Sequence, residues 1–401
     1  MGTIITLNLG NLEISCEKNE FYESFRDLFK PEDWKDINYY YCDNITKVQK
    51  GYSRKLSLVK PRLELLGFTL KNIREIYENN YYEYCGYMDE YDKYILTYDE
   101  FFELFTNIDL SKADKSSENC SQNFTEYIGN CTFEDSKLKD LAEKYTYYCS
   151  NHPFGEFYNT LPTRLFIRIL CENPSTKNLS LQWHVFDHIE NGWAEETDFT
   201  PRLEDKDKIL IVTEGKSDTY IIRTSIAALF PEISDFFYFI DMHENYPFTG
   251  TGNLTNFYEG LIKIRPQNKI IIIFDNDYFG ISAYNKCRKK PNDIPNLKLY
   301  HLPDLPEFKE FLTVGPTGEA YQDVNGKAVA IECFLDLLYE SDMPPKVEWS
   351  SCKQQNNQPQ GALLAKEKYT KNFKKYFYNE KYNKDKLIFL INDIINFWCN
   401  D

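Results

Sequence analysis

The chain has 401 residues, of which 42% are hydrophobic and 27% charged, with 17 glycines and 17 prolines. This composition excludes collagen-like and low-complexity proteins, and the length is typical of two or three domains. Because 46 Lys and Arg stand against 62 Asp and Glu, the formal net charge is −16. A nucleic-acid partner would therefore have to be held by a local basic patch or by bound cations.

The first half begins with a predicted β-hairpin. Residues 3–9 and 12–16 alternate apolar and polar side chains on either side of Gly10-Asn11, a dipeptide typical of tight turns. The spacing of leucines and isoleucines over residues 53–80 predicts a helix that is broken near Gly67. Further along, residues 111–123 are interpreted as a surface loop, residues 161–171 as a helix or a strand, and residues 179–189 as a strand.

From residue 208 the pattern changes to apolar runs that alternate with helical stretches. Predicted strands cover residues 208–213, 236–241, 270–274 and 297–300, and predicted helices cover 217–230, 254–264 and the stretch after Gly280. Ser217 or Asp218 is the expected N-cap of the first of these helices. Continuous apolar strands separated by helices are typical of a parallel sheet covered by helices on both faces, so the fold class is α/β.

The last hundred residues are predicted to be mostly helical. Residues 328–338 form an expected helix, and residues 341–361, which contain prolines and a Gln/Asn-rich run, are interpreted as a linker. The final forty residues are expected to be helical and carry lysines among aromatic residues. Such a segment can hold a single nucleic-acid strand, but it is more often an amphipathic packing helix.

Three acidic residues follow two of the predicted strands. Glu214 ends one strand, and Asp275 and Asp277 end another, where alternation places the last two on the same face. Ligands of parallel sheets bind outside the carboxyl ends of the strands. If the two strands are neighbours, these carboxylates converge together with Asp218 from the first turn of the following helix.

Converging carboxylates raise one another's pKa unless a cation compensates their charge, and hard oxygen ligands suit Mg²⁺ or Mn²⁺ better than zinc. The alternative is that these acidic residues only form solvated turns at the strand ends. That alternative readily explains a single acidic residue, but it explains two acidic clusters after two buried strands less well. Gly215-Lys216-Ser217 is not a phosphate-binding loop, because Leu210 occupies the position of the required first glycine.

The remaining composition predicts a cytoplasmic protein. No apolar run is long enough to cross a bilayer, and the first residues lack a signal-peptide pattern. The 11 cysteines are scattered without a CxxC pair, which is typical of reduced thiols and gives no zinc-site pattern.

At the two acidic motifs the chain resembles a known domain. Residues 212–218 (VTEGKSD) and 274–280 (FDNDYFG) are similar to the two signature motifs of the Toprim domain, which occurs in topoisomerases, primases and OLD-family nucleases. The N-terminal hairpin and the helical stretch after it resemble, more loosely, the N-terminal module of bacterial HEPN/Toprim-associated proteins, a group suspected of anti-phage defence. The resemblance implies an N-terminal α+β module over residues 1–205, a Toprim domain over 206–306 and a helical extension over 307–401.

The resemblance also implies roles for matching residues. Glu214 would act as an acid/base or metal-organising carboxylate, and Asp275 and Asp277 would bind Mg²⁺. Asp218 would help to hold a second metal ion, as in the nuclease branch. Glu332 lies where such nucleases can supply another acidic ligand, although a glutamate on a helix surface is the more common explanation.

The chain departs from the relatives in several ways. No arginine precedes a histidine at the spacing used by HEPN ribonucleases, so no HEPN activity is assigned. No ATPase region precedes the Toprim-like motifs as it does in the OLD family, which leaves open an ATPase or regulatory protein on another chain. Homo-oligomerisation is also left open.

The leading hypothesis is a metal-dependent nuclease acting on DNA or RNA, tRNA included. Lysines and an arginine near the motifs are expected to grip the phosphate backbone, with a solvated helix end as the equal alternative. These residues are Lys216, Lys286, Arg288, Lys289 and Lys290. The second hypothesis is a scaffold or regulatory protein whose Toprim fold senses nucleic acid or a nucleotide without cutting it.

Overall fold

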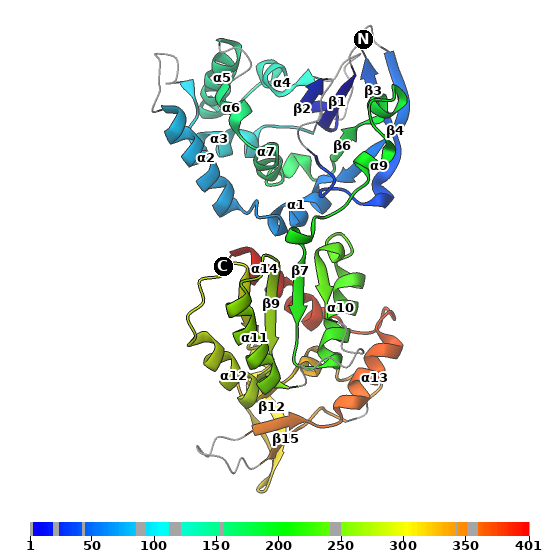
Figure 1. Cartoon of the computed structure of the whole chain (residues 1–401), viewed down its shortest axis with the longest axis vertical. Helices are drawn as coiled ribbons and strands as arrows, with labels where there is room; N and C mark the ends of the chain where they lie inside the picture. Colours follow the sequence, from blue (N-terminus) through cyan, green and yellow to red (C-terminus); the bar gives the residue numbers. More distant parts are fainter. Residues whose placement is uncertain are drawn as a thin grey trace. The chain divides into compact units, whose positions relative to one another are not determined.

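The computed structural model describes residues 3–18, 24–41, 45–85, 94–111, 122–151, 156–240, 250–341, 343–350 and 360–400 (Figure 1). The chain divides into two compact units, Met1–Leu203 and Glu204–Asp401. Both units mix helices with β-sheets. Among the described residues, the helices are too short or too polar to cross a membrane.

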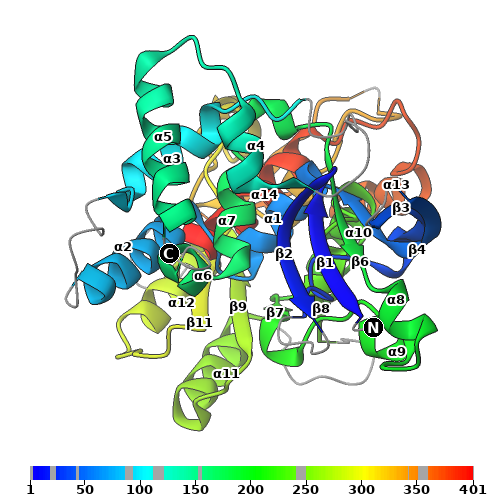
Figure 2. The ribbon, with the colours of Figure 1, turned by 90° about the horizontal axis from the view of Figure 1, so that it is seen from above.

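The first unit contains a six-stranded sheet in the order β3-β4-β6-β1-β2-β5. The predicted hairpin is confirmed, because β1 and β2 pair antiparallel and Gly10 between them has a φ of 57°. Figure 2 shows the two strands side by side. The predicted strand over residues 179–189 is confirmed only in its first part, as β6, which pairs with β1, because Phe186–Glu190 forms the short helix α8. The bounds are β1 (Ile4–Leu9), β2 (Leu12–Lys18), β3 (Trp34–Tyr41), β4 (Ile45–Lys55), β5 (Gln122–Asn123) and β6 (Ser180–His184).

Helices pack beside this sheet around an aromatic core. The predicted break at Gly67 is confirmed: its φ is 97°, and it separates α1 from α2. The predicted helix over residues 53–80 starts later than expected, because β4 continues to Lys55 and α1 begins after it. The helices are α1 (Leu56–Leu65), α2 (Leu70–Cys85), α3 (Tyr98–Asn107), α4 (Phe124–Asn130), α5 (Ser136–Asn151), α6 (Glu156–Thr160), α7 (Thr163–Leu170), α8 (Phe186–Glu190) and α9 (Glu196–Phe199).

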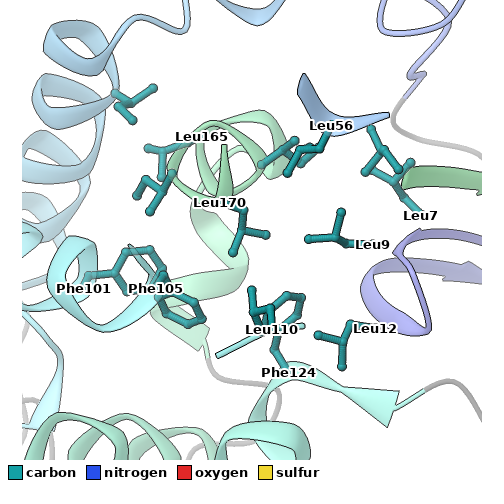
Figure 3. Close-up of a cluster of buried hydrophobic side chains, with 14 of the residues drawn as sticks. Leu7, Leu9, Leu12, Leu56, Phe101, Phe105, Leu110, Phe124, Leu165 and Leu170 are labelled. Atoms are coloured by element: carbon teal, nitrogen blue, oxygen red, sulfur yellow. The ribbon is translucent and has the colours of Figure 1, made fainter. Parts of the chain in front are cut away.

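Figure 3 shows part of the core, in which Phe101 and Phe105 of α3, leucines of α7 and leucines of the hairpin belong to one cluster. The two rings have centroids 4.6 Å apart, and both side chains are buried. Residues 161–171, which the sequence left as helix or strand, contain helix α7. The predicted loop at 111–123 lies mostly outside the described residues, and its last two residues form β5.

The second unit contains a four-stranded sheet in the order β11-β9-β7-β8. All three strand pairs are parallel, as the continuous apolar runs predicted. The strands are β7 (Ile209–Val212), β8 (Phe237–Phe239), β9 (Lys269–Phe274) and β11 (Leu297–His301), and the helices between them are α10 (Lys216–Leu229), α11 (Thr251–Ile264) and α12 (Tyr278–Arg288). Residue 241, the end of the predicted second strand, lies outside the described residues. That this sheet is Toprim-like stays a prediction.

The segment after residue 306 differs from the helical prediction. Among its described residues, α-helix occurs only in the final part, as α13 (Lys366–Tyr376) and α14 (Asp385–Asn400). Before it, a second four-stranded sheet has the order β13-β12-β15-β16, and a short pair joins β10 to β14. These strands are β10 (Asn276–Asp277), β12 (Phe311–Gly315), β13 (Gly318–Gln322), β14 (Ala328–Val329), β15 (Val347–Ser350) and β16 (Gln360–Leu363).

Two interpretations of this segment are therefore wrong. Residues 328–338 do not form an α-helix: they start with β14, and Ile331–Phe334 forms a 3-10 turn whose side chains are all buried. Their apolar run reflects burial from all sides and not a helical face. The predicted linker at 341–361 contains β15 and the start of β16, while residues 342 and 351–359 lie outside the described residues. The predicted boundary after residue 306 falls inside the second unit.

Candidate functional site

Glu214 lies in the turn between β7 and α10. Thr213 is buried, and its hydroxyl donates to the carbonyl of Gly215 at 3.0 Å, which fixes the turn from strand to helix. Gly215, with extended backbone angles, is the N-cap of α10. The expected cap at Ser217 or Asp218 is therefore wrong. Since the helix starts at Lys216, Asp218 falls in its first turn and faces inward.

The second acidic motif meets the first directly. Strands β7 and β9 are neighbours, with Val212 opposite Ile272, so both motifs leave the sheet at the same edge. The backbone N–H of Asp275 donates to Oε1 of Glu214 at 3.1 Å. The sequence predicted this meeting on the condition that the two strands are neighbours, because the carboxyl ends of neighbouring parallel strands share one edge.

Asp277 is held firmly on both of its carboxylate oxygens. It caps α12, where Oδ1 accepts the Gly280 N–H at 2.7 Å, and its Oδ2 accepts from Nε2 of Gln360 at 2.9 Å. A Cβ on Gly280 would lie 2.2 Å from the carbonyl oxygen of Asp275. The helix can approach the strand end this closely only because residue 280 has no side chain.

The protonation of these carboxyls reflects their crowding. Burial, followed by the charges of Asp277 and Asp218, raises the pKa of Glu214 to about 7. Burial and the charge of Glu332 raise the pKa of Asp218 to about 7 as well. Burial and the charges of Asp218 and Glu214 raise the pKa of Asp275 well above its ordinary range. Burial is the largest cause in all three cases, and repulsion between the carboxylates adds to it, while Lys366 offsets part of the rise.

Glu332 is not a surface residue. It lies in the 3-10 turn after β14 with only 6% of its surface exposed, so the surface explanation is wrong. Its Oε2 lies 3.8 Å from Nζ of Lys366. Burial disfavours the charged form of this lysine, but the carboxylates of Glu332, Asp275 and Asp277 outweigh that effect and raise its pKa. Lys366 is thus a cationic neighbour of the whole cluster.

Two residues that face the carboxylates, Gln360 and Lys366, were not identified as site residues from the sequence. Both belong to the short segment from β16 to the start of α13, and the residue before Lys366, Ala365, has a left-handed φ of 59°. A non-glycine residue in this region is uncommon and often occurs at functional sites. The lysine-rich stretch itself was visible, but nothing in its pattern distinguished Lys366 from the other lysines.

Of the expected basic residues, Lys216 lies beside the carboxylates, at the exposed first position of α10 directly after the turn that holds Glu214. The other four lie at the opposite end of α12, whose 11 residues span ~16 Å from the end that Asp277 caps. One of them, Lys290, pairs instead with Glu259 at 3.2 Å.

The donor set fits a hard divalent cation in chemistry, since it consists of buried carboxylates with incomplete charge compensation. Its arrangement is not that of a closed cage. Within the described ranges, no group of three or more His, Cys, Asp and Glu side chains is positioned to hold a metal ion. Side-chain rotation, and for Asp277 the exchange of a hydrogen bond, would be needed to chelate one.

Comparison with known proteins identifies the first unit. A family model described as HEPN/Toprim N-terminal domain 1 matches residues 1–207, which is more than half of the 401-residue chain. No curated protein and no solved structure matches the chain significantly.

Proposed function

This chain belongs to the HEPN/Toprim-associated family, and from that premise we propose that its second unit is a Mg²⁺- or Mn²⁺-dependent Toprim nuclease. The observation that carries the proposal is the meeting of Glu214, Asp218 and Asp275 at one sheet edge, with pKa values raised by burial and by one another. Perturbed carboxyl groups of this kind cluster at functional sites. A closer likeness to the OLD nucleases remains a prediction.

In this proposal a bound divalent cation supplies charge neutralisation at the phosphoryl oxygens and helps to activate water. The residues of the chain position the reactants and move protons. Glu214 has Oε1 engaged by the Asp275 N–H, so Oε2 is the atom that accepts a proton from the attacking water. A pKa of about 7 suits that role near neutral pH.

Asp218 and Asp275 are the proposed metal ligands, with Glu332 as a further one. Asp277 would join them once Gln360 releases Oδ2, because Gly280 still holds Oδ1. Lys366, next to Glu332, is proposed to stabilise negative charge that develops on the phosphoryl group.

The proposal is tested by cleavage assays on plasmid, single-stranded DNA and total tRNA with Mn²⁺ or EDTA. Glu214→Gln and Asp275→Asn are expected to lose cleavage by at least about 100-fold, while circular dichroism shows an intact fold. Glu367→Gln is a matched control, because its side chain is 93% exposed in the same helix as Lys366. Normal cleavage by Glu214→Gln and Asp275→Asn would refute the proposal.

One observation favours a second function, that of a nucleic-acid sensor that does not cut. Both oxygens of Asp277 are satisfied by protein donors, and Lys366 already contributes positive charge to the cluster. A sensor of this kind needs no metal ion. Binding that is unchanged by EDTA, together with no cleavage of the three substrates, would favour it.

We propose a role in bacterial anti-phage defence on the strength of the family alone. The test compares phage plaque counts on cells that express the wild-type chain or Glu214→Gln. Protection that disappears in the variant supports a catalytic defence role, and equal protection by both supports the sensor.

A further inference from the structure

The solvent-facing side of α10 carries a basic and aromatic stripe that starts at the carboxylate site. Lys216, Tyr220, Arg223 and Ala227 follow the i, i+4, i+7, i+11 spacing that places residues on one helix face. Lys216, Tyr220, Arg223 and Ala227 are all exposed. We call these four residues the α10 stripe; the buried side of the helix, which includes Ser225, lies opposite.

Helix α13 adds a third cation to the stripe. Nζ of Lys374 lies 4.9 Å from the centre of the Tyr220 ring, and Phe373 packs edge-on against the same ring with centroids 6.0 Å apart. Phe373 is fully buried, whereas Tyr220 retains 40% of its surface exposed. The tyrosine ring is therefore fixed in orientation by its neighbours and remains available to a ligand.

A pocket lies further along the stripe, next to β8, the last strand in the order of the parallel sheet. It has a volume of about 380 Å³. Its walls combine Arg223 and Ala227 of α10 with Phe237, Tyr238 and Phe239 of β8, and Ser234 and Asp235 add polar atoms. A pocket with aromatic walls and a few polar groups suits a planar heterocycle.

We propose that the α10 stripe and this pocket bind single-stranded nucleic acid, with phosphates on Lys216, Arg223 and Lys374 and bases on Tyr220 and in the pocket. Cationic side chains that alternate with aromatic platforms are the means by which proteins hold single strands without sequence preference. Within the described part of the chain, neither Lys216 nor Arg223 takes part in an ion pair, so their charge remains available for phosphate. This matters in a protein with a net charge of −16, where binding a polyanion depends on local basic surface.

The stripe also begins at the carboxylate site and runs away from it along α10. Glu214 and Asp218 lie at the start of the helix. From Lys216 to Arg223 the helix rises by seven residues, or ~10 Å, so Arg223 lies about that far along the axis from the site. A strand on the stripe would thus deliver a phosphodiester to the carboxylates. This part of the proposal rests on the proposed nuclease function, whereas binding itself does not.

The experiment measures binding by fluorescence anisotropy with labelled single-stranded DNA, single-stranded RNA and duplex DNA. All proteins carry Glu214→Gln and the buffer contains EDTA, so neither cleavage nor metal ions affect the result. Tyr220→Ala is expected to weaken single-strand binding by about five- to 100-fold, the range for one lost stacked base, while Tyr220→Phe retains the affinity. Arg223→Ala should reduce the slope of log Kd against log salt concentration by about 0.7, the value for one lost phosphate contact on a single strand.

Arg288→Ala serves as the comparison, since it removes the same charge from the far end of α12. Single-strand affinity that falls with Arg288→Ala but not with Arg223→Ala or Tyr220→Ala overturns the proposal. So does binding of duplex alone, or no binding of any nucleic acid, which would leave the stripe to a protein partner. If single strands bind at the stripe but wild-type protein cuts nothing, the stripe stands and the nuclease function fails. If the wild-type protein cleaves nucleic acid but binding does not depend on the stripe, the nuclease function stands and the proposal for the stripe fails.

Discussion

Replacing Glu214 by glutamine should stabilise the second unit at alkaline pH. Glutamine keeps the oxygen that accepts the Asp275 N–H but cannot ionise. In the folded protein the pKa of Glu214 is raised from 4.5 to about 7, chiefly by burial and then by the charges of Asp277 and Asp218. Folding therefore favours the protonated form, and the folded state loses stability as this carboxyl ionises.

The magnitude follows from the difference of about 2.5 between the two pKa values. At ~1.36 kcal/mol for each pKa unit, the upper bound is ~3.4 kcal/mol. Because Glu214 keeps partial contact with solvent, which screens the effect, we expect ~1–2 kcal/mol. The wild type begins to lose stability as the pH rises above about 4.5, where the Glu214 carboxyl ionises in the unfolded chain. The loss of stability is complete above about pH 7, where this carboxyl is ionised in the folded protein too. Below pH 4.5 glutamine should bring no such gain.

The assay is urea unfolding of both full-length proteins, followed by circular dichroism in EDTA at several pH values from 4.5 to 8. The free energy of unfolding of the wild type should fall more steeply with pH than that of Glu214→Gln. Adding Mg²⁺ at pH 8 should restore more stability to the wild type than to the variant, because the cation compensates the ionised carboxylate. Parallel pH curves for the two proteins would refute the electrostatic account of the site.

Three further changes test other parts of the molecule. Gly280→Ala places a Cβ 2.2 Å from the Asp275 carbonyl, so we expect a loss of ~1–3 kcal/mol in thermal unfolding together with lost cleavage; unchanged stability would contradict the close approach. Asp33→Ala leaves Arg54, its partner at 2.7 Å, buried without that carboxylate, and should cost the first unit ~3–5 kcal/mol in urea unfolding while the second unit's transition stays in place. Lys366→Met removes a positive charge from the cluster and should tighten Mn²⁺ binding in calorimetry while slowing cleavage by about tenfold or more, whereas Lys366→Arg should preserve both; weaker Mn²⁺ binding in the methionine variant would contradict this role.

The sequence alone determined the strands of the parallel sheet and the position of each acidic motif at the end of a strand. The run at 270–274 is long, β-branched and apolar, so local preference and burial point to the same structure. Both features depend on short-range patterns, which a sequence displays directly. That Glu214 and Asp275 meet depends in addition on β7 and β9 being neighbours, which the tertiary structure decided.

Tertiary structure decided the rest of the site. Gln360 and Lys366 reach the carboxylates only because β16 pairs with β15 and the chain then turns at Ala365 into α13. Gly361 permits this close packing, since a Cβ there would lie 2.6 Å from a methyl group of Val347. Pairings between segments far apart in the chain leave no periodic signal in either segment.

The same reason explains the misplaced elements and the charges. Residues 328–338 have an apolar pattern that fits a helix, but the surroundings bury residues 328–335 on all sides and select a strand and a 3-10 turn. The cationic residues in and just after the last turn of α12 are near the second acidic motif in sequence, yet the length of the helix carries them away from it. Strand ends in the sequence predicted the positions of the acidic residues, but distance in space decided which cations accompany them.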